Sequence, residues 1–93
     1  MPFVYILRCS DNSLYVGHTN DLSTREKTHN DGTGADYTAR RRPVCLVYSE
    51  TFESTHDAVA RERQLKHWSR AKKQALIGGD VDGLKSLSKR HRP

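Results

Sequence analysis

The sequence lacks a long hydrophobic run, an excess of acidic residues and a rich supply of cysteine. No stretch approaches the roughly 18 apolar residues that cross a bilayer, and the first residues lack the basic and apolar regions of a secretion signal. We therefore expect no membrane association. The two cysteines, Cys9 and Cys45, are too few for a four-cysteine zinc site. Because both lie in apolar runs, we expect core thiols and a reducing, cytoplasmic location.

What the chain does have is basic charge. Lysine and arginine number 16 against 11 acidic residues, which gives a formal net charge of +5. This surplus favours a polyanion as partner, because each phosphate that is neutralised releases bound counterions. A basic surface that binds nothing fits the charge equally well. With 93 residues there is room for one small core and no deep cleft, so we expect an open site that suits a long substrate.

Two short apolar runs at the start of the chain predict a β-hairpin. β-branched and aromatic residues favour strands over 3–9 and 14–17, with turn-forming residues between them. A two-residue loop would place Tyr5 and Tyr15 on opposite faces of the hairpin. A three-residue loop over 10–12 would place them on the same face, and Asn12 tolerates the left-handed conformation that such a loop needs. Two core tyrosines and two functional tyrosines both fit this arrangement.

The remaining elements predict an α+β fold. A third strand is expected over 44–50, after a polar and basic loop over 32–43. Helices are expected over 21–30, with Asp21 as N-cap, and over 54–68, 70–77 and, more weakly, 80–88. This order predicts a small three-stranded, mainly antiparallel sheet with a ββαβ core, flanked by helices. We expect residues 1–80 to form one domain and residues 81–93 a helical and basic tail.

The helix over 54–68 carries a carboxylate on its inward face. Ala58, Glu62 and Leu65 fall on one side of the helix, which must also meet the sheet. A carboxylate withdrawn from water is costly unless it is paired, protonated or bound to a metal. The alternative is a partly exposed Glu62 that pairs with Lys66, one turn later.

Two further polar residues share a face of the helix over 21–30. Arg25 offers a fixed fork of donors that matches a phosphate, and His29 can exchange a proton near neutral pH. Both also fit a solvated helix surface. The other histidines show no metal-ligand spacing with one another or with cysteine, so we expect no zinc site.

The loop over 32–43 combines Tyr37 with Arg40, Arg41 and Arg42. Basic residues beside an aromatic ring suit a nucleic-acid backbone and an unstacked base, and Lys66 is a further candidate for such a contact. An ordinary solvated loop remains an alternative.

Taken together, these motifs resemble the GIY-YIG nuclease family. Its first motif stands here as Phe3-Val4-Tyr5 and its second as Tyr15-Val16-Gly17, followed by Arg25 and by Glu62 in the later helix. The resemblance covers roughly residues 3–77. In detail it is similar to the small single-domain bacterial branch and to the nuclease domain of a eukaryotic structure-specific endonuclease subunit.

The sequence departs from the family pattern at a few positions. Phe3 stands where the family name has glycine, and His18 follows Gly17 where a smaller residue is expected. The late asparagine of some relatives has no counterpart.

The resemblance implies hydrolysis of a DNA phosphodiester with one divalent ion, Mg²⁺ or Mn²⁺, held by Glu62. Arg25 would then clamp the phosphate, and Tyr5 would deprotonate or orient the attacking water, which Tyr15 and His29 would help to position. It also implies branched or single-strand-bearing DNA as substrate, in repair or recombination. Two alternatives are a DNA-binding module without catalysis and a catalytic subunit that needs a protein partner.

Overall fold

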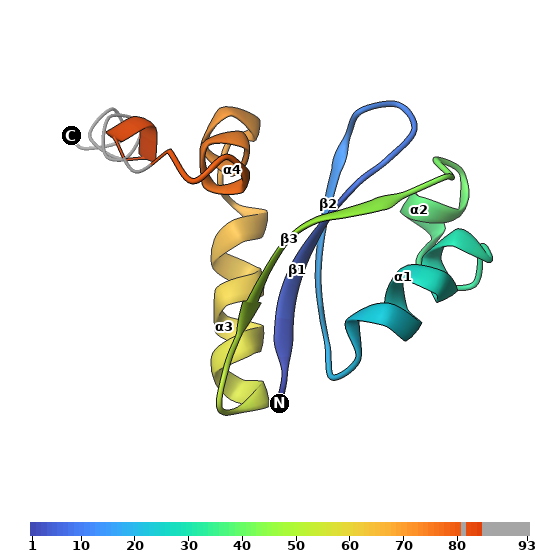
Figure 1. The fold of residues 1–93 in the computed structure, drawn as a ribbon, viewed down its shortest axis with the longest axis horizontal. Helices are drawn as coiled ribbons and strands as arrows, with labels where there is room; N and C mark the ends of the chain where they lie inside the picture. Colours follow the sequence, from blue (N-terminus) through green and yellow to red (C-terminus); the bar gives the residue numbers. More distant parts are fainter. Residues whose placement is uncertain (81, 85–93) are drawn as a thin grey trace.

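The computed structural model describes residues 1–80 and 82–84 and shows a three-stranded sheet with helices on both sides (Figure 1). The strands are β1 (Phe3–Arg8), β2 (Leu14–Thr19) and β3 (Cys45–Thr51), in the spatial order β2-β1-β3. Strand β1 pairs antiparallel with both neighbours. The predicted α+β class and the antiparallel sheet are confirmed.

The helices mostly begin where the sequence predicts. They are α1 (Leu22–Asn30), α2 (Asp36–Ala39), α3 (Thr55–Lys66) and α4 (Arg70–Ile77). The side chains of Asp21, Ser54 and Ser69 each accept a backbone N–H of the helix that follows, as N-caps do. The prediction of an irregular loop over 32–43 was wrong in part, because its centre forms the short helix α2. The helix predicted over 80–88 is seen only over 82–84; residue 81 and residues 85–93 lie outside the described part, so the predicted tail stays a prediction.

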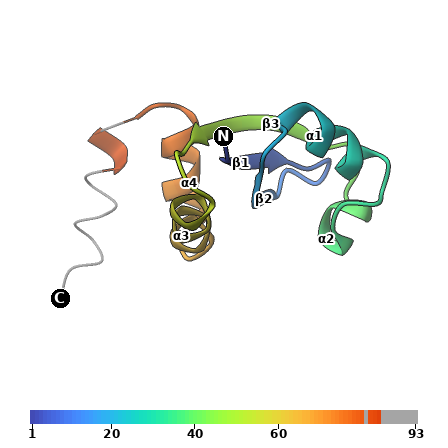
Figure 2. The same cartoon turned by 90° about the horizontal axis from the view of Figure 1, so that it is seen from below.

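The two faces of the sheet carry different cores. Val4, Ile6 and Val16 point toward α3, where they pack with the buried Ala58 and Leu65. The opposite face holds Tyr5, Leu7, Cys9 and Val44, covered from the side of α1 and α2. Figures 1 and 2 show α3 and α4 grouped on one side of the sheet and α1 and α2 on the other. The strand alternation thus gives each face its own helices.

The two cysteines do not share one environment. Cys9 is buried as expected, but Cys45 is exposed at the start of β3. The expectation of two core thiols was therefore wrong for Cys45, because a strand at the edge of the sheet turns alternate side chains to solvent.

The hairpin has the three-residue loop that places both tyrosines on one face. Leu7 pairs with Tyr15 and Tyr5 with Gly17 across the ladder. The Cys9 amide donates to the Ser13 carbonyl at 2.9 Å, which closes the loop over 10–12. Asn12 has a φ of 68°, the left-handed conformation that such a loop requires.

Helix α1 is held to the sheet mainly by polar contacts, since Leu22 is its only partly buried apolar residue packed on the core. Glu26 accepts the Leu46 amide at 2.6 Å. Asn30 accepts the Val44 amide at 2.7 Å and donates to the Val44 carbonyl at 3.0 Å. These two side chains, one helical turn apart, fix α1 against the start of β3.

Replacing Asn30 by alanine should lower the free energy of unfolding by about 2–3 kcal/mol, because both backbone groups of Val44 would lose their partners. Chemical denaturation measures the change. Asn30→Asp keeps the acceptor and should recover part of the loss, and the exposed Asn20→Ala serves as control. An Asn30→Ala protein as stable as the Asn20→Ala protein would contradict the assigned role.

Within the described residues, no helix combines the length and apolar character that crossing a membrane demands.

Candidate active site

A buried chain of hydrogen bonds begins at Tyr5 on β1. The Tyr5 hydroxyl lies 2.9 Å from Nε2 of His29, and Nδ1 of His29 lies 2.7 Å from Oγ1 of Thr38 in α2. All three side chains are almost completely buried. The Thr38 hydroxyl donates onward to the Ala35 carbonyl at 3.0 Å. The chain therefore links β1, α1 and α2.

Which group donates in each hydrogen bond follows from the bond between Thr38 and the Ala35 carbonyl. A hydroxyl carries one hydrogen, and Thr38 gives it to a carbonyl that can only accept. Thr38 must then accept the Nδ1–H of His29. In a neutral imidazole this leaves Nε2 as the acceptor, so the Tyr5 hydroxyl donates to it. Nε2 of His29 is therefore the acceptor of the Tyr5 hydrogen bond.

Burial, with smaller effects from nearby charges, keeps both Tyr5 and His29 neutral. Burial, and after it the Tyr15 phenol, raise the pKa of Tyr5 far above its usual range, although the Arg25 charge acts in the opposite direction. Burial, followed by the positive charge of Arg25, lowers the pKa of His29 below its ordinary value of 6.5. Tyr5 is therefore a phenol that donates a hydrogen bond rather than a standing phenolate.

Two glycines make room for the hydrogen-bonded side chains of Tyr5 and His29. A side-chain carbon added at Gly17 would lie 2.5 Å from the Tyr5 hydroxyl oxygen, and one added at Gly34 would lie 2.5 Å from Nδ1 of His29. Real carbon atoms do not approach so closely. Position 17 of the second motif must therefore be glycine, because the Tyr5 side chain of the first motif occupies the space that a larger residue would need.

Gly17→Ala should displace the Tyr5 hydroxyl and lower any Tyr5-dependent hydrolysis by roughly a hundredfold, since a misplacement of about 1 Å can cost that much. The substitution leaves the strand pairing in place, so the fold should survive. Rates should be measured beside Gly78→Ala, a glycine outside the site where an added carbon meets only backbone atoms at 3.5 Å or more. Equal rates for the two variants would argue against this role for Gly17.

Aromatic rings extend the site from Tyr15 toward the surface. The Tyr15 ring lies 5.2 Å from the His29 ring and 6.0 Å from that of Tyr37, with the two phenols inclined by 28°. Tyr37 is exposed, and the Arg41 guanidinium carbon lies 3.8 Å from its ring centre. The structure therefore brings three of the sequence-predicted residues, Tyr15, His29 and Tyr37, into one aromatic row.

Arg25 lies on the same helix as His29 and is half-buried. Its positive charge acts on both Tyr5 and His29, as the directions of their pKa shifts show. No ion pair between described residues uses Arg25. It helps line a surface hollow together with residues of the β2–α1 connection and of α1: Thr19, Asn20, Asp21, Thr24 and Thr28. The guanidinium is thus free for an anion beside Tyr5.

Glu62 lies at the margin of the core, on the other face of the sheet. Its side chain is 14% exposed; one carboxylate oxygen contacts Nδ1 of His18 and the other lies 2.7 Å from Nζ of Lys66. Burial acts to raise the pKa of the Glu62 carboxyl, but hydrogen bonds and charge from Lys66 and His18 outweigh it and hold the pKa below its usual range. Glu62 is therefore ionised. Both expectations hold together: the residue faces inward, and it also pairs with Lys66.

The Glu62 carboxylate has the chemistry of a ligand for a hard divalent cation. Mg²⁺ and Mn²⁺ bind ionised carboxylate oxygen and fill their other positions with water and substrate phosphate. The described residues contain no cluster of three or more metal-ligating side chains. A single ionised carboxylate is compatible with an ion of this kind, which takes few protein ligands.

The two halves of the site meet across β2, a strand at the edge of the sheet. Tyr5 reaches over Gly17 from one side, while the next residue, His18, points to the opposite side and meets Glu62. Glu62 also acts on the pKa of Tyr5. Tyr5, Arg25 and Glu62 therefore surround one stretch of an exposed edge strand.

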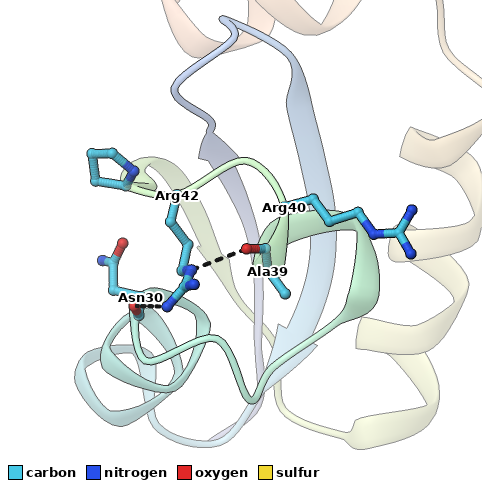
Figure 3. Close-up of a pocket in the computed structure, with 5 residues that line it drawn as sticks. Asn30, Ala39, Arg40 and Arg42 are labelled. Atoms are coloured by element: carbon cyan, nitrogen blue, oxygen red, sulfur yellow. Dashed lines mark hydrogen bonds between the residues drawn. The ribbon is translucent and has the colours of Figure 1, made fainter.

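The basic loop is more constrained than its sequence indicates. Arg41 donates to Asp11 at 3.0 Å and to the Tyr37 carbonyl at 2.9 Å. Arg42 donates to the carbonyls of Ala39 at 3.0 Å and Asn30 at 3.4 Å. The two Arg42 bonds lie beside a surface hollow, and the Arg40 side chain, which also lines it, extends away from Arg42 (Figure 3). Of the three arginines, Arg40 has no hydrogen-bond partner among the described residues.

Sequence reasoning missed three contributors to the site. Thr38 and Gly34 lie in the segment expected to be an irregular loop, and His18 was set aside because it has no ligand spacing along the chain. The sequence indicates a special role for His18 only indirectly, because the family pattern has a smaller residue after Gly17. Its contact with Glu62 joins residues 44 positions apart, which no local pattern reveals.

Comparisons with known proteins agree with the geometry. The family model described as the GIY-YIG catalytic domain matches residues 1–75. A UPF0213 protein of Bacillus velezensis is 52% identical over 75 residues, which cover 81% of this chain and 76% of that protein. A UPF0213 protein of Staphylococcus haemolyticus is 51% identical over 75 residues, covering 81% and 92%.

Solved structures give the same result. The solution NMR structure of a UPF0213 protein from Bacillus halodurans is 39% identical, with a TM-score of 0.56, and the match covers 98% of this chain and 97% of the other. The solution NMR structure of a protein from E. faecalis is 35% identical, with a TM-score of 0.56 and coverage of 98% and 90%. The chain therefore belongs to the GIY-YIG catalytic domain family, as its motifs predict, and is a relative of the small bacterial UPF0213 proteins.

Proposed function

We propose that this chain is a divalent-metal-dependent endonuclease that hydrolyses DNA phosphodiester bonds. The GIY-YIG catalytic domain supports a nuclease-type hydrolase. The observation that carries the proposal is the buried chain from Tyr5 through His29 to Thr38, which gives Tyr5 a proton acceptor. A module that only bound DNA would not need the inward carboxylate of Glu62.

The hydrogen bonds from Tyr5 through His29 to Thr38 provide a route for the proton of the attacking water. As the water oxygen bonds to phosphorus, its proton passes to the Tyr5 oxygen, and the Tyr5 proton passes to Nε2 of His29. The imidazolium that forms keeps its Nδ1–H bond to Thr38. Tyr15 packs on His29 and holds the ring in place. Tyr5 thus acts without first becoming a phenolate.

Arg25 and Glu62 complete the site. Arg25 binds the non-bridging phosphate oxygens, where negative charge grows in the transition state. Glu62 holds the divalent ion, Mg²⁺ or Mn²⁺, which when bound stabilises the leaving oxygen. The Glu62 carboxylate is ready for this role because it is already ionised.

The surface beside the site supports DNA with an unpaired or branched segment as the substrate. Tyr37 is exposed next to Tyr15, which suits stacking of an unstacked base, and Arg40 is available for a backbone phosphate. Arg41, Arg42 and Lys66 are secondary contacts, since each already has a partner within the protein. We propose a cytoplasmic role in repair or recombination, with a protein partner adding specificity for the DNA structure.

A cleavage assay tests the function directly. The protein should be incubated with duplex, single-stranded, flap and four-way DNA in Mg²⁺, Mn²⁺ or EDTA. We expect cleavage with either metal, none in EDTA, and preference for substrates with unpaired strands. Arg25→Ala should lose cleavage, whereas Arg63→Ala, an exposed arginine on α3, should retain it. Binding without any cleavage would favour the non-catalytic module.

The rate of cleavage should fall on the acid side with the protonation of His29. Protonated His29 cannot accept the Tyr5 proton, and its pKa lies below 6.5 because of burial and the Arg25 charge. Activity should therefore be full above about pH 7 and be lost as the pH drops through a midpoint below 6.5. Single-turnover rates between pH 4.5 and 9 check this.

His29→Ala tests the assignment, because its residual rate should lack that acid limb. An acid limb with a midpoint above 6.5, or one that persists unchanged in His29→Ala, would rule out His29 as the acceptor.

A further inference from the structure

Among the described residues, His18 is the histidine whose ring contacts the Glu62 carboxylate. It follows Gly17 on β2, and its Nδ1 meets Oε1 of Glu62. The His18 side chain is 41% exposed and that of Glu62 is 14% exposed. The pair therefore joins a largely buried carboxylate to a partly exposed imidazole on the α3 face of the edge strand.

We propose that His18 supplies a second protein ligand, Nδ1, to the divalent ion that Glu62 holds. The proposal rests on the proposed function, since it concerns the same ion. It adds a nitrogen ligand to a site that otherwise offers one carboxylate.

The backbone already positions both donors. Val16, two residues before His18, packs in the same buried cluster as Ala58 and Leu65, which flank Glu62 on α3. The cluster fixes β2 against α3, so little ordering is left for the ion to impose. To admit an ion, the His18 ring would have to turn away from Oε1, and its 41% exposure leaves it room to do so.

Lys66 does not compete for this space. Its Nζ holds the other oxygen, Oε2, at 2.7 Å. The carboxylate thus keeps an orienting partner on one oxygen while the other faces His18. An ion bound to Oε1 and Nδ1 would leave Oε2 to Lys66, whose positive charge would weaken the binding of the cation. Water and phosphate oxygen would fill its other positions.

The nitrogen ligand has a consequence for metal preference. Mg²⁺ prefers oxygen ligands, whereas imidazole binds first-row transition ions more readily, and Mn²⁺ accepts both kinds. A site with carboxylate and imidazole should therefore bind Mn²⁺ more tightly than Mg²⁺, and His18 should be the reason.

Mn²⁺ binding tests the proposal without reference to activity. Isothermal titration with MnCl₂ and with MgCl₂ gives both affinities, and pulsed EPR of bound Mn²⁺ detects a coordinated nitrogen through its coupling to the electron spin. We expect a nitrogen coupling in the unmodified protein. His18→Ala should remove it and weaken Mn²⁺ binding roughly tenfold or more, while Mg²⁺ affinity changes by less than about threefold. His56→Ala, an exposed histidine on α3, is the matched control.

The outcomes distinguish a failure of the His18 assignment from a failure of the proposed metal-dependent nuclease function. A nitrogen coupling that persists in His18→Ala, or an unchanged Mn²⁺ affinity, would overturn the ligand assignment even if DNA is still cut. Loss of cleavage in His18→Ala with unchanged Mn²⁺ binding would also overturn it, and would make His18 a residue that only positions Glu62. If Glu62→Gln binds Mn²⁺ as well as the unmodified protein, the metal site of the proposed function fails instead.

Discussion

Replacing Glu62 by glutamine should reduce DNA cleavage by roughly a thousandfold, because removing one well-placed charge from an active site has effects of this size. Glutamine has nearly the same shape but carries no negative charge, so its neutral amide oxygen should bind a divalent cation far more weakly. The neighbouring core residues Ala58 and Leu65 are untouched. The lost ion pairs with Lys66 and His18 involve partly exposed partners, so the stability should change by less than about 1 kcal/mol. Single-turnover cleavage in Mn²⁺ and thermal unfolding together check both statements.

The control is an exposed glutamate away from the site, Glu53→Gln, which should cut DNA like the unmodified protein. Raising the Mn²⁺ concentration should not restore Glu62→Gln to full activity, because the charged ligand has become a neutral one. Cleavage that persists in Glu62→Gln, or in EDTA, would exclude the metal mechanism. A variant that fails to fold would be seen in the unfolding trace, and Glu62→Ala would then repeat the test with a smaller side chain.

Tyr5→Phe should lower the cleavage rate by about a hundredfold to ten-thousandfold, the range for loss of a general base. The ring stays in its buried position between the sheet and α1, and only the hydroxyl disappears. His29 loses a hydrogen-bond donor, which should cost about 1 kcal/mol of stability. DNA affinity in Ca²⁺, measured by fluorescence anisotropy, should remain within a few fold. The effect should therefore appear in the rate of the chemical step.

Tyr48→Phe is the matched control, because among the described residues the Tyr48 hydroxyl bonds Glu50 on the same strand and not a residue of the site. A double variant adds a second check. If Tyr5 and His29 act on the same proton, Tyr5→Phe combined with His29→Ala should be little worse than either change alone. If the two changes lower the cleavage rate independently, so that their free-energy effects add, Tyr5 and His29 do not act on the same proton. A Tyr5→Phe enzyme within threefold of the unmodified rate would remove Tyr5 from the chemistry.

The sequence predicts much of this arrangement wherever the information is local. The register of the hairpin follows from loop length, and Asn12 indicates the longer loop through its tolerance of a positive φ. The inward position of Glu62 follows from helical spacing with Ala58 and Leu65. Asp21 identifies the start of α1 because a cap acts on its own helix alone.

The contacts that join distant elements could not be read in the same way. Thr38 bonds His29 only because a single helical turn, α2, forms inside a segment rich in glycine and arginine. Helix α1 docks through Glu26 and Asn30 rather than through an apolar stripe, so hydrophobic spacing carries no signal for its orientation. The arginines of the loop looked free, and the acceptors that occupy Arg41 and Arg42 are mostly backbone carbonyls, which every sequence contains.

The three-residue turn of the hairpin bears on how this chain can change its length. Surface turns usually accept an inserted or deleted residue, since nothing packs on them. Here a deletion within 10–12 would shift β2 by one residue against β1 and exchange its two sides. Tyr15 would leave the side of His29, and His18 would leave that of Glu62. The length of this turn is therefore set by the enzyme chemistry on either side of β2, and an indel there removes both halves of the site at once.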